Sequence, residues 1–350
     1  MRIVVLAGGT STERDVSISS GILVAEALRK KGHEVVLLDI YTGYEQDILD
    51  VDELFKKNYS FTDKVNVGES VGDTISDIEE VKENRRNKSE RFIGESVIDI
   101  CDFADITFLA LHGGAGENGQ VQAAFDLLGI KYTGSGYFGS ALAMNKGLTK
   151  SVLIQNKVLT PGGKIYKTEE EAMEWNSFPC VVKPCSGGSS VGITIANNAE
   201  EFVSSVKEAL SYGEDDIVVE EYIKGREFSV GLLGGRALPP IEIIPKEGFY
   251  DYRTKYQAGA AEDVCPADIT PEEDQKLRKA AEDTYRALQL ESYARVDFIL
   301  DEEGKPYCLE ANTLPGMTPT SLLPQEARAE GMEYPDLCEK IIEISMERYK

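Results

Sequence analysis

Three oxygen-bearing side chains lie near the end of the chain, in a segment that predicts a β-hairpin. Asp297 falls on the first predicted strand, and Glu310 and Asn312 fall on the second. Because side chains alternate along a strand, Glu310 and Asn312 share a face, and Arg295 shares one with Asp297. Mg²⁺ prefers one or two carboxylates with phosphate oxygens and water, and arginine binds a phosphoryl group through two parallel hydrogen bonds. The hairpin therefore predicts a metal and phosphate site, with an ordinary exposed hairpin as the alternative.

A loop rich in glycine and serine follows Lys183 at the end of a predicted strand. Three glycines and three serines lie between Pro184 and Gly192. Glycines let the backbone approach phosphate oxygens closely, and serine hydroxyls add hydrogen-bond donors. No Lys-Ser or Lys-Thr pair follows the glycines, so the loop is not a Walker A loop. It predicts a phosphate-binding loop, with a surface turn as the alternative.

Two further strand ends are weaker candidates. The segment from Gly8 to Arg14 opens a predicted helix, where free backbone N–H groups favour anions, but it lacks the GxGxxG pattern. A tight turn is the alternative there. Glu220-Glu221-Tyr222-Ile223, followed by Glu227, offers backbone that can read an adenine edge and a carboxylate that can bind ribose hydroxyls. A solvated acidic strand end is the alternative for that segment.

Two other segments predict loops that touch a ligand. The turn 313–318 (TLPGMT) could present backbone N–H groups to a developing oxyanion. The segment 248–256 (GFYDYRTKY) combines aromatic and cationic residues without a clean period, which favours either a loop that closes over a site or a packed edge segment.

The elements that position these residues follow from the apolar pattern. Strand 3–7, a helix carrying Ile22, Ala25 and Leu28, and strand 35–38 predict a βαβ unit, so the N-terminal part is α/β. A polar excursion is predicted over 58–96. Further predicted elements are the strands 106–111, 178–183, 217–222 and 228–233, the helix 121–128, a helix from Lys146, a short helix after Thr168, and the hairpin 295–300 and 306–309. Thr270-Pro271-Glu272-Glu273 predicts a capped helix start.

Composition narrows the function classes. The 350 residues carry a formal charge of −24, which disfavours nucleic acid and anionic membranes as partners. No apolar run is long enough to span a bilayer or to form a signal peptide, so we expect a cytoplasmic protein. Six scattered cysteines and two histidines predict reduced thiols and no zinc site.

Taken in order, nine segments resemble the D-alanine–D-alanine ligases of the ATP-grasp superfamily. The matching segments are GGTSTERDVSISSG, LHGGAGENG, YTGSG, SALAMNK, VVKPCSGGSSVGI, EEYIKGREFSV, FYDYRTKY, ARVDF and LEANTLPGMTPTS. They cover nearly the whole chain apart from the excursion at 58–96. The resemblance implies an α/β and α+β ATP-grasp fold of three domains: a Rossmann-like parallel-sheet domain (1–134), a small central domain (135–224) and a C-terminal catalytic domain (225–350).

The resemblance also implies which residues bind ATP and two Mg²⁺ ions, with Mn²⁺ as an alternative metal. Lysines would contact the phosphates, Glu220 and the backbone near Tyr222 and Ile223 would face the adenine, and Glu227 would face the ribose. The implied nucleotide set is Lys146, Lys183, Glu220, Tyr222, Ile223, Glu227 and Lys255. The implied metal ligands are Asp297, Glu310 and Asn312.

A second implied set binds two D-alanines and supports the chemistry. Glu13 would bind the ammonium of the first D-alanine, His112 would lie near its carboxylate, and Ser321 would bind the second carboxylate. With Glu13, two further residues would form a hydrogen-bonded trio: Ser189 and Tyr256. Two groups would stabilise the tetrahedral intermediate: the Arg295 side chain and the Gly316 backbone.

The implied reaction joins two D-alanines through an acyl phosphate formed from ATP, for peptidoglycan precursors. A homodimer is implied, and the partners are the small-molecule substrates rather than nucleic acid or membrane. D-alanyl-D-serine or D-alanyl-D-lactate synthesis and a non-catalytic nucleotide-binding regulator are the alternatives. Tyr256 favours an amine acceptor over lactate. A dinucleotide-dependent dehydrogenase is a distant alternative, because the third glycine of its fingerprint is missing.

Overall fold

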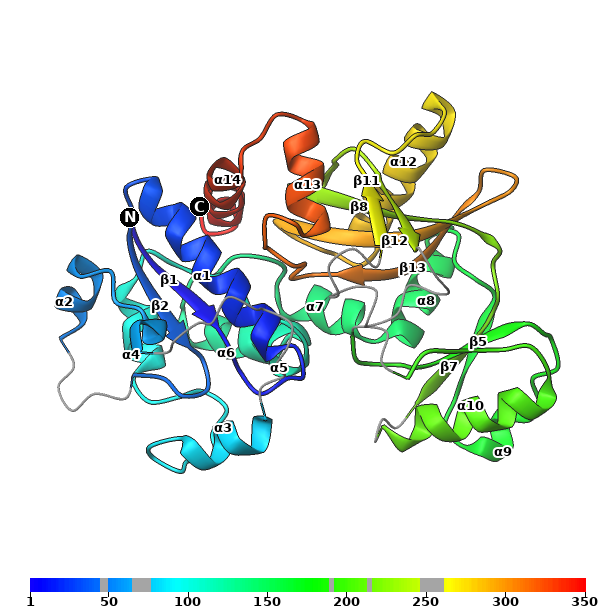
Figure 1. Cartoon of the computed structure of the whole chain (residues 1–350), viewed down its shortest axis with the longest axis horizontal. Helices are drawn as coiled ribbons and strands as arrows, with labels where there is room; N and C mark the ends of the chain where they lie inside the picture. The colour runs from blue at the N-terminus through cyan, green and yellow to red at the C-terminus, as the bar shows by residue number, and fades with distance from the viewer. Residues whose placement is uncertain (45–49, 65–76, 189–191, 213–215, 246–260) are drawn as a thin grey trace. The chain divides into compact units, whose positions relative to one another are not determined.

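The described part of the chain forms two compact units. The computed structural model describes residues 1–44, 50–64, 77–188, 192–212, 216–245 and 261–350 (Figure 1). Within these limits the first unit takes in 1–140, 291–294 and 313–350, and the second takes in 141–290 and 295–312. The division into domains 1–134, 135–224 and 225–350 stays a prediction.

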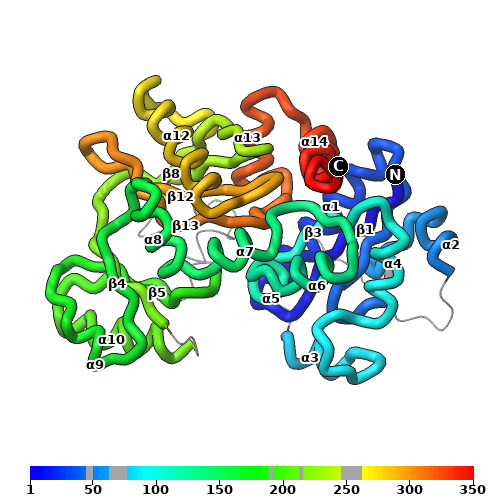
Figure 2. The backbone as a smooth tube through the Cα atoms, turned by 180° about the vertical axis from the view of Figure 1, so that it is seen from behind, coloured from blue at the N-terminus to red at the C-terminus, as the bar shows by residue number. Residues whose placement is uncertain are grey.

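A three-stranded parallel sheet forms the centre of the first unit. Its strands are β1 (Arg2–Ala7), β2 (Glu34–Asp39) and β3 (Ile106–Leu109), in the order β2-β1-β3. Figure 2 labels β1 and β3, which are neighbours in this sheet. Residues 3–7 are fully buried, as expected for the middle strand of a parallel sheet covered on both faces. The predicted βαβ unit is therefore confirmed. Its carboxyl edge carries the turns that start at Gly8 and Leu111.

Helices surround this sheet and complete the first unit. They are α1 (Arg14–Lys30), α2 (Val51–Lys56), α3 (Ile78–Asn84), α4 (Val97–Phe103), α5 (Gly114–Glu117), α6 (Gln120–Leu128), α13 (Leu322–Ala329) and α14 (Tyr334–Glu347), with a 3-10 turn at Phe61–Lys64. Helix α7 (Tyr137–Met144) begins in the first unit and ends in the second. α14 packs against α1, so the end of the chain is part of the N-terminal unit.

The predicted polar excursion is only partly a surface feature. α3 has no buried residue, as the polar sequence predicted. Arg85, directly after it, is 1% exposed and lies over the Tyr41 ring at 4.3 Å from the centroid. Its guanidinium donates to the carbonyl oxygens of Ser89 and Arg91 at 2.6 and 2.5 Å. A charged residue can be buried here because it closes this loop with hydrogen bonds.

The second unit contains two antiparallel sheets. The central sheet has the order β4-β7-β5-β6, and the other has the order β11-β10-β8-β12-β13, with β9 paired to β8. The central strands are β4 (Gly163–Tyr166), β5 (Cys180–Pro184), β6 (Thr194–Ala196) and β7 (Ile217–Glu221). The other strands are β8 (Gly225–Leu233), β9 (Arg236–Ala237), β10 (Ile241–Pro245), β11 (Ala261–Val264), β12 (Tyr293–Asp301) and β13 (Pro306–Asn312). Tyr293 and Ala294, at the start of β12, belong to the first unit.

Four helices accompany these sheets in the described part of the second unit, and the sequence predicts where several of them begin. They are α8 (Lys146–Gln155), α9 (Glu169–Ala172), α10 (Ala199–Ser211) and α12 (Pro271–Ala287). The predicted capped start at Thr270 is confirmed: its side chain and that of Glu273 exchange hydrogen bonds with each other's backbone N–H. The predicted helix from Lys146 is also confirmed, and the Asn145 side chain caps it by accepting from Leu148 N–H at 2.9 Å. The predicted combination of α/β and α+β regions is confirmed.

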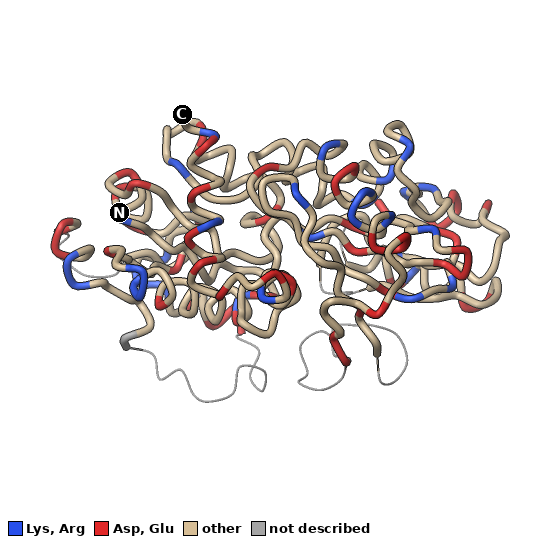
Figure 3. The backbone as a smooth tube through the Cα atoms, turned by 90° about the horizontal axis from the view of Figure 1, so that it is seen from above, with Lys and Arg blue, Asp and Glu red and all other residues tan. Residues whose placement is uncertain are grey.

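Acidic and basic residues are distributed along the chain in both units (Figure 3). In the parts of the chain that the structure describes, we find no helix with the length and apolar character needed to cross a membrane.

Candidate active site

The predicted hairpin brings its polar residues together on one face of the second sheet. β12 and β13 are antiparallel, with Arg295 opposite Asn312 and Asp297 opposite Glu310. Directly opposite residues point to the same side, and so do residues two apart on one strand. All four side chains therefore lie on one face. A register shift follows immediately between Asp297 and Phe298, so the regular pairing ends beside the acidic pair.

Asp297 is the most tightly held residue of this face. Its Oδ1 accepts hydrogen bonds from Ser229 Oγ at 2.7 Å and from Arg295 Nε at 2.9 Å. Its Oδ2 accepts from Arg295 Nη2 at 2.9 Å and from Asn312 Nδ2 at 3.1 Å. Each carboxylate oxygen thus has two donors, and the bidentate arginine compensates the buried charge. The side chain is fixed before any ligand arrives.

The donor set of this face suits a hard divalent cation. Two carboxylates, Asp297 and Glu310, face each other with the Asn312 amide beside them. Among the described residues, no group of three or more His, Cys, Asp and Glu side chains is placed to hold a metal ion. Two carboxylates plus an amide match a Mg²⁺ site that phosphate oxygens and water complete. An ion on Asp297 would have to compete with the Arg295 and Asn312 donors.

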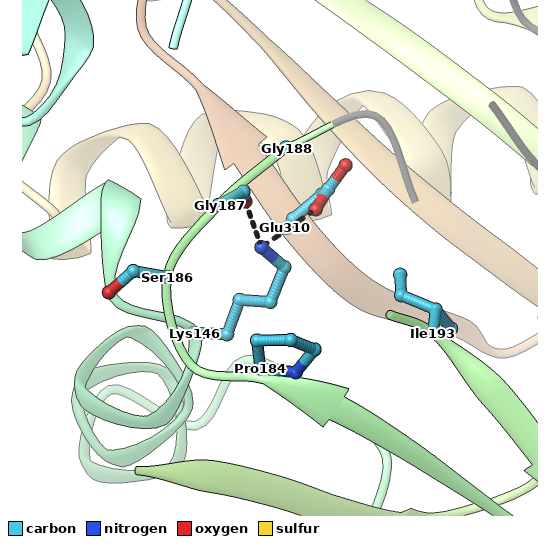
Figure 4. A pocket seen from close by; sticks show the side chains of 7 residues that line it. All are labelled: Lys146, Pro184, Ser186, Gly187, Gly188, Ile193 and Glu310. Carbon is cyan, nitrogen blue, oxygen red and sulfur yellow. Dashed lines mark hydrogen bonds and ion pairs between the residues drawn. The ribbon is translucent and has the colours of Figure 1, made fainter. Parts of the chain in front are cut away.

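Lys146 approaches the same face from helix α8. Its ammonium lies 3.6 Å from Glu310 Oε2 and donates to Gly187 O at 2.7 Å (Figure 4). Its backbone N–H donates to Cys185 O at 2.7 Å, so the helix start is attached to the glycine–serine loop. Figure 4 shows Pro184, Gly187 and Ile193 around a small pocket beside the ammonium. Lys146 therefore contacts both the predicted phosphate-binding loop, at Gly187, and the predicted metal-binding face of the hairpin, at Glu310.

A buried charge cluster lies on the central sheet. Glu220 on β7 is 3% exposed and accepts from Lys183 Nζ at 2.7 Å and from Lys150 Nζ at 2.9 Å. Lys183 on β5 is diagonal to Glu220 across the strand pair, within reach of a long side chain. Burial alone would raise the pKa of Glu220, but the two ammonium groups hold it below its ordinary value. The carboxylate is therefore ionised at neutral pH.

Helix α8 connects the two groups. Lys146 and Lys150 are four residues apart, so they project from one side of the helix. Lys146 reaches Glu310 on the C-terminal sheet, and Lys150 reaches Glu220 on the central sheet. A methyl group at Gly147 would lie 2.5 Å from Ile165 Cδ1, so α8 packs closely on β4 at this glycine.

The segment after β7 provides the other predicted nucleotide contacts. Tyr222 and Ile223 lie between β7 and β8, and Tyr222 is 40% exposed. Tyr222 N–H donates to Pro179 O at 3.4 Å. Glu227 is partly exposed on β8, opposite Ile243 of β10. Tyr222 and Ile223 follow the end of β7 closely, so they lie near Glu220.

A second group of predicted residues gathers at the carboxyl edge of the parallel sheet, within the first unit. Glu13 immediately precedes α1, where the helix N-terminus favours a carboxylate. Ser11 Oγ donates to His112 O at 2.5 Å. Gly113 has a φ of +65°, and a methyl group there would lie 2.7 Å from Glu13 Oε2. Glu13 and the His112 segment are therefore neighbours, as the amino-acid-binding prediction requires.

Helix α1 also links His112 to the turn at 313–318. The buried Ser20 hydroxyl lies 3.3 Å from His112 Nε2 and accepts from Met317 N–H at 3.4 Å. Gly316 is next to Ser321, because a methyl group at Gly316 would lie 2.8 Å from Ser321 Oγ. Ser321 Oγ accepts from Thr318 N–H at 3.1 Å and precedes α13. The structure thus places His112, Gly316 and Ser321 around one turn.

Three predicted residues lie outside the described part of the chain. They are Ser189, Lys255 and Tyr256.

Sequence reasoning missed several residues that hold these groups. They are Ser11, Ser20, Glu117, Lys150, Thr160 and Ser229. Glu117 is typical: it accepts from Gly113 N–H at 2.9 Å and from Leu314 N–H at 3.4 Å, so it joins the turn after His112 to the turn at 313–318. For Lys150 a signal existed, because it repeats the helical position of Lys146 one turn later. The buried serines carry no local signal.

Comparison with known proteins agrees with the geometry. The family model described as "D-ala D-ala ligase N-terminus" matches residues 2–135, and the one described as "D-ala D-ala ligase C-terminus" matches 152–343. A D-alanine–D-alanine ligase of Pediococcus pentosaceus is 43% identical over 98% of this chain and 97% of its own length. One from Lacticaseibacillus casei is 42% identical, covering 100% of this chain and 97% of that protein.

Solved structures show the same similarity. The crystal structure of a D-alanine–D-alanine ligase from Bacillus anthracis has a TM-score of 0.74 at 32% identity, with 99% of this chain and 98% of that chain covered. A structure of that ligase complexed with ATP has a TM-score of 0.73 at 30% identity, with coverages of 99% and 97%. The ligase from Coxiella burnetii has a TM-score of 0.76 at 26% identity, with coverages of 100% and 94%.

Proposed function

Since this chain belongs to the D-alanine–D-alanine ligase family, we propose that the two described groups of polar residues divide its reaction between them. The fold is that of the ATP-grasp ligases. The reaction is the ATP-dependent joining of two D-alanines for peptidoglycan precursor synthesis. The second unit is proposed to bind the nucleotide, and the residues around α1 and the turn 313–318 are proposed to bind the amino acids.

The proposed nucleotide contacts follow the charge of the second unit. Lys146 and Lys183 bind phosphate oxygens, because both ammonium groups are buried beside the glycine–serine loop or its strand. Lys255 would add a third contact. Glu220 accepts from the adenine amino group, and the backbone at Tyr222 and Ile223 reads the rest of that edge. Glu227 binds the ribose hydroxyls, for which its partly exposed place on β8 is suitable.

Asp297, Glu310 and Asn312 are proposed to hold two Mg²⁺ ions, or Mn²⁺ in their place. Bound ions would offset the charge of the transferring phosphoryl group. The support is the set of oxygen donors on one face of the hairpin, next to Lys146. Arg295 shares that face and adds a fixed guanidinium that can accompany a phosphoryl group.

The proposed chemistry has two steps that balance without a further reactant. A carboxylate oxygen of the first D-alanine attacks the γ-phosphorus of ATP, the bond to the bridging oxygen breaks, and ADP leaves. The amine of the second D-alanine then attacks the acyl carbon, loses a proton, and expels inorganic phosphate. Arg295 and the Gly316 N–H stabilise the tetrahedral oxyanion between attack and expulsion. Positioning and charge compensation supply most of the rate enhancement.

The proposed amino-acid contacts use the carboxyl edge of the parallel sheet. Glu13 binds the ammonium of the first D-alanine, and His112 lies beside its carboxylate. Ser321, at the start of α13, binds the carboxylate of the second D-alanine, where helix N–H groups add to the hydroxyl. Ser189 and Tyr256 are proposed to complete a hydrogen-bonded trio with Glu13.

The proposal extends to the state of the protein in the cell. We propose a homodimer in the cytoplasm, with the domain limits 1–134, 135–224 and 225–350. Light scattering coupled to size exclusion tests the dimer, because a monomeric mass at micromolar concentration would contradict it.

The observation that carries the proposal is the hairpin face on which Arg295, Asp297 and Glu310 meet Lys146. The test is phosphate release from ATP in the presence of D-alanine, with mass analysis of the product. We expect D-alanyl-D-alanine, and release that depends on D-alanine. D-serine and D-lactate offered as acceptors distinguish the alternative ligases. A chain that binds ATP but releases no phosphate with any of these acceptors would contradict the proposal.

A further inference from the structure

Lys150 is a buried lysine that neither the sequence motifs nor the proposed reaction uses. Its side chain is 6% exposed, and its ammonium has three hydrogen-bond acceptors. They are Glu220 Oε1 at 2.9 Å, Thr160 Oγ1 at 3.0 Å and Pro161 O at 2.5 Å. An ammonium has three N–H groups, so this one is fully satisfied. Leaving this position would break three hydrogen bonds in a buried place.

Lys183 contacts the same carboxylate but is held less firmly. Its ammonium donates to Glu220 Oε2 at 2.7 Å. Within the described part of the chain, that oxygen is its one hydrogen-bond acceptor. Lys183 is also the last residue but one of β5, directly before the glycine–serine loop. Of the two lysines, Lys183 therefore loses fewer hydrogen bonds when it turns toward a phosphate.

Movement of Lys183 would change the charge environment of Glu220. If Lys183 moves to a phosphate, Glu220 loses one of two counter-ions while remaining buried. A buried carboxylate without a positive partner takes up a proton, because burial disfavours its charged form. A protonated Glu220 would keep only its weaker carbonyl acceptor for the adenine amino group, and its O–H would add a donor that this amino group cannot use. Some cation must therefore stay on Glu220 while Lys183 is engaged.

We propose that Lys150 is the positioning residue that stays on Glu220, keeping this carboxylate ionised for the nucleobase while Lys183 turns to the phosphates. The inference rests on the proposed function, in which Glu220 faces adenine and Lys183 faces phosphate. Burial lowers the pKa of Lys150, and the Glu220 carboxylate offsets only part of that effect. Its three acceptors are nevertheless arranged for an ammonium, since the Pro161 carbonyl oxygen and the ionised Glu220 Oε1 can only accept and the Thr160 hydroxyl can accept as well.

The consequence is nucleobase selectivity. Adenine has an amino group at position 6, which donates to a carboxylate. Hypoxanthine has a carbonyl there, which an ionised carboxylate repels and a protonated one can bind. Loss of the Lys150 charge should therefore weaken the binding of ATP and should make inosine triphosphate a better substrate relative to ATP. The D-alanine sites belong to other residues and should not respond.

The test compares Lys150→Met, Lys150→Arg and the control Lys164→Met in the full-length protein. Lys164 is an exposed lysine on β4, opposite Val219, so its replacement removes an equal charge from the same sheet. We expect Lys150→Met to raise the KM for ATP at least tenfold and to lower the ratio of kcat/KM for ATP over inosine triphosphate at least tenfold. The KM for D-alanine should stay within twofold. Lys150→Arg should recover part of the selectivity, and Lys164→Met should match the wild type.

A folded Lys150→Met variant with wild-type selectivity and KM for ATP would overturn the inference. Should that variant fail to fold, Thr160→Val keeps the charge and removes one acceptor of Lys150, and we expect a two- to fivefold loss in the same two quantities. No loss in either quantity would overturn the inference as well. Glu220→Met, which has no strong acceptor for the adenine amino group, separates the two proposals. If it retains full selectivity, Glu220 does not face adenine and both fall; if it loses selectivity while Lys150→Met does not, only the Lys150 inference falls.

Discussion

Replacing Glu220 with glutamine removes the one carboxylate that two buried lysines share. The change keeps the volume and leaves the Lys150 and Lys183 ammonium groups, both under 10% exposed, without their counter-ion. Breaking a buried ion pair by removing one partner costs about 3–5 kcal/mol, because the other charge stays buried. In a unit of this size about 1 kcal/mol shifts the Tm by roughly 2–4 °C, so we expect a decrease of roughly 6–20 °C. Differential scanning calorimetry of both proteins without nucleotide measures this decrease in Tm.

The loss of Tm in Glu220→Gln should depend on pH. The pKa of Glu220 is lowered in the folded protein, so its ion pairs stabilise the fold at pH values above the ordinary glutamate pKa. That stabilisation is lost as the pH falls through the lowered value. The Tm difference between wild type and Glu220→Gln should therefore be largest near neutral pH and should narrow below about pH 4.

The control for this experiment is an exposed ion pair. Lys224 and Glu302 lie 2.8 Å apart, with side chains 82% and 76% exposed. Glu302→Gln should leave the Tm unchanged, because water screens this pair. If Glu220→Gln melts with the wild type at neutral pH, the reasoning from burial is refuted. A Tm difference that does not change with pH would refute the assignment of the effect to charge.

Three other perturbations have expected outcomes. Asp297→Asn should lower kcat by at least tenfold, because it replaces a ligand oxygen and one charge, and it should also lower the Tm by several degrees, because Arg295 loses a buried counter-ion; near-normal turnover at saturating Mg²⁺ would contradict the metal assignment. Ser20→Ala should raise the KM for D-alanine several-fold and leave the KM for ATP unchanged, since the hydroxyl contacts His112 and Met317; equal effects on both substrates would contradict a local role. EDTA should abolish turnover and added Mg²⁺ should restore it, and activity that survives chelation would exclude the proposed ions.

Features encoded by neighbouring residues could be predicted from the sequence. The cap at Thr270 uses residues three apart, and the hairpin of Asp297 and Glu310 uses alternation and a short turn. In both cases the chain brings the partners together within one element or one connection. Prediction of these elements therefore needed no knowledge of tertiary structure.

Contacts between distant segments could not be predicted in that way. The family resemblance implies that Glu220 faces adenine, but the sequence does not indicate its two counter-ions. They come from β5 and α8, and Lys150 is separated from Glu220 by 70 residues. Ser229 supports Asp297 from a neighbouring strand 68 residues earlier. A buried serine has the same local pattern whether or not it holds an active-site carboxylate. Only the register of the sheet identifies which serine does so.

The charges of the described residues of the second unit bear on how an acidic protein can bind a triphosphate and on why metal ions are proposed beside it. Helix α8 connects two groups of charges that together contain four cations (Lys146, Lys150, Lys183 and Arg295) and three carboxylates (Glu220, Asp297 and Glu310). The surplus is a single positive charge, which is small compared with the charge of a triphosphate. Lysines alone therefore cannot compensate the ligand while Glu220 and Asp297 remain ionised. Divalent ions at the proposed hairpin site would supply the missing charge beside the phosphates, so we expect nucleotide affinity and metal affinity to rise together in a binding titration.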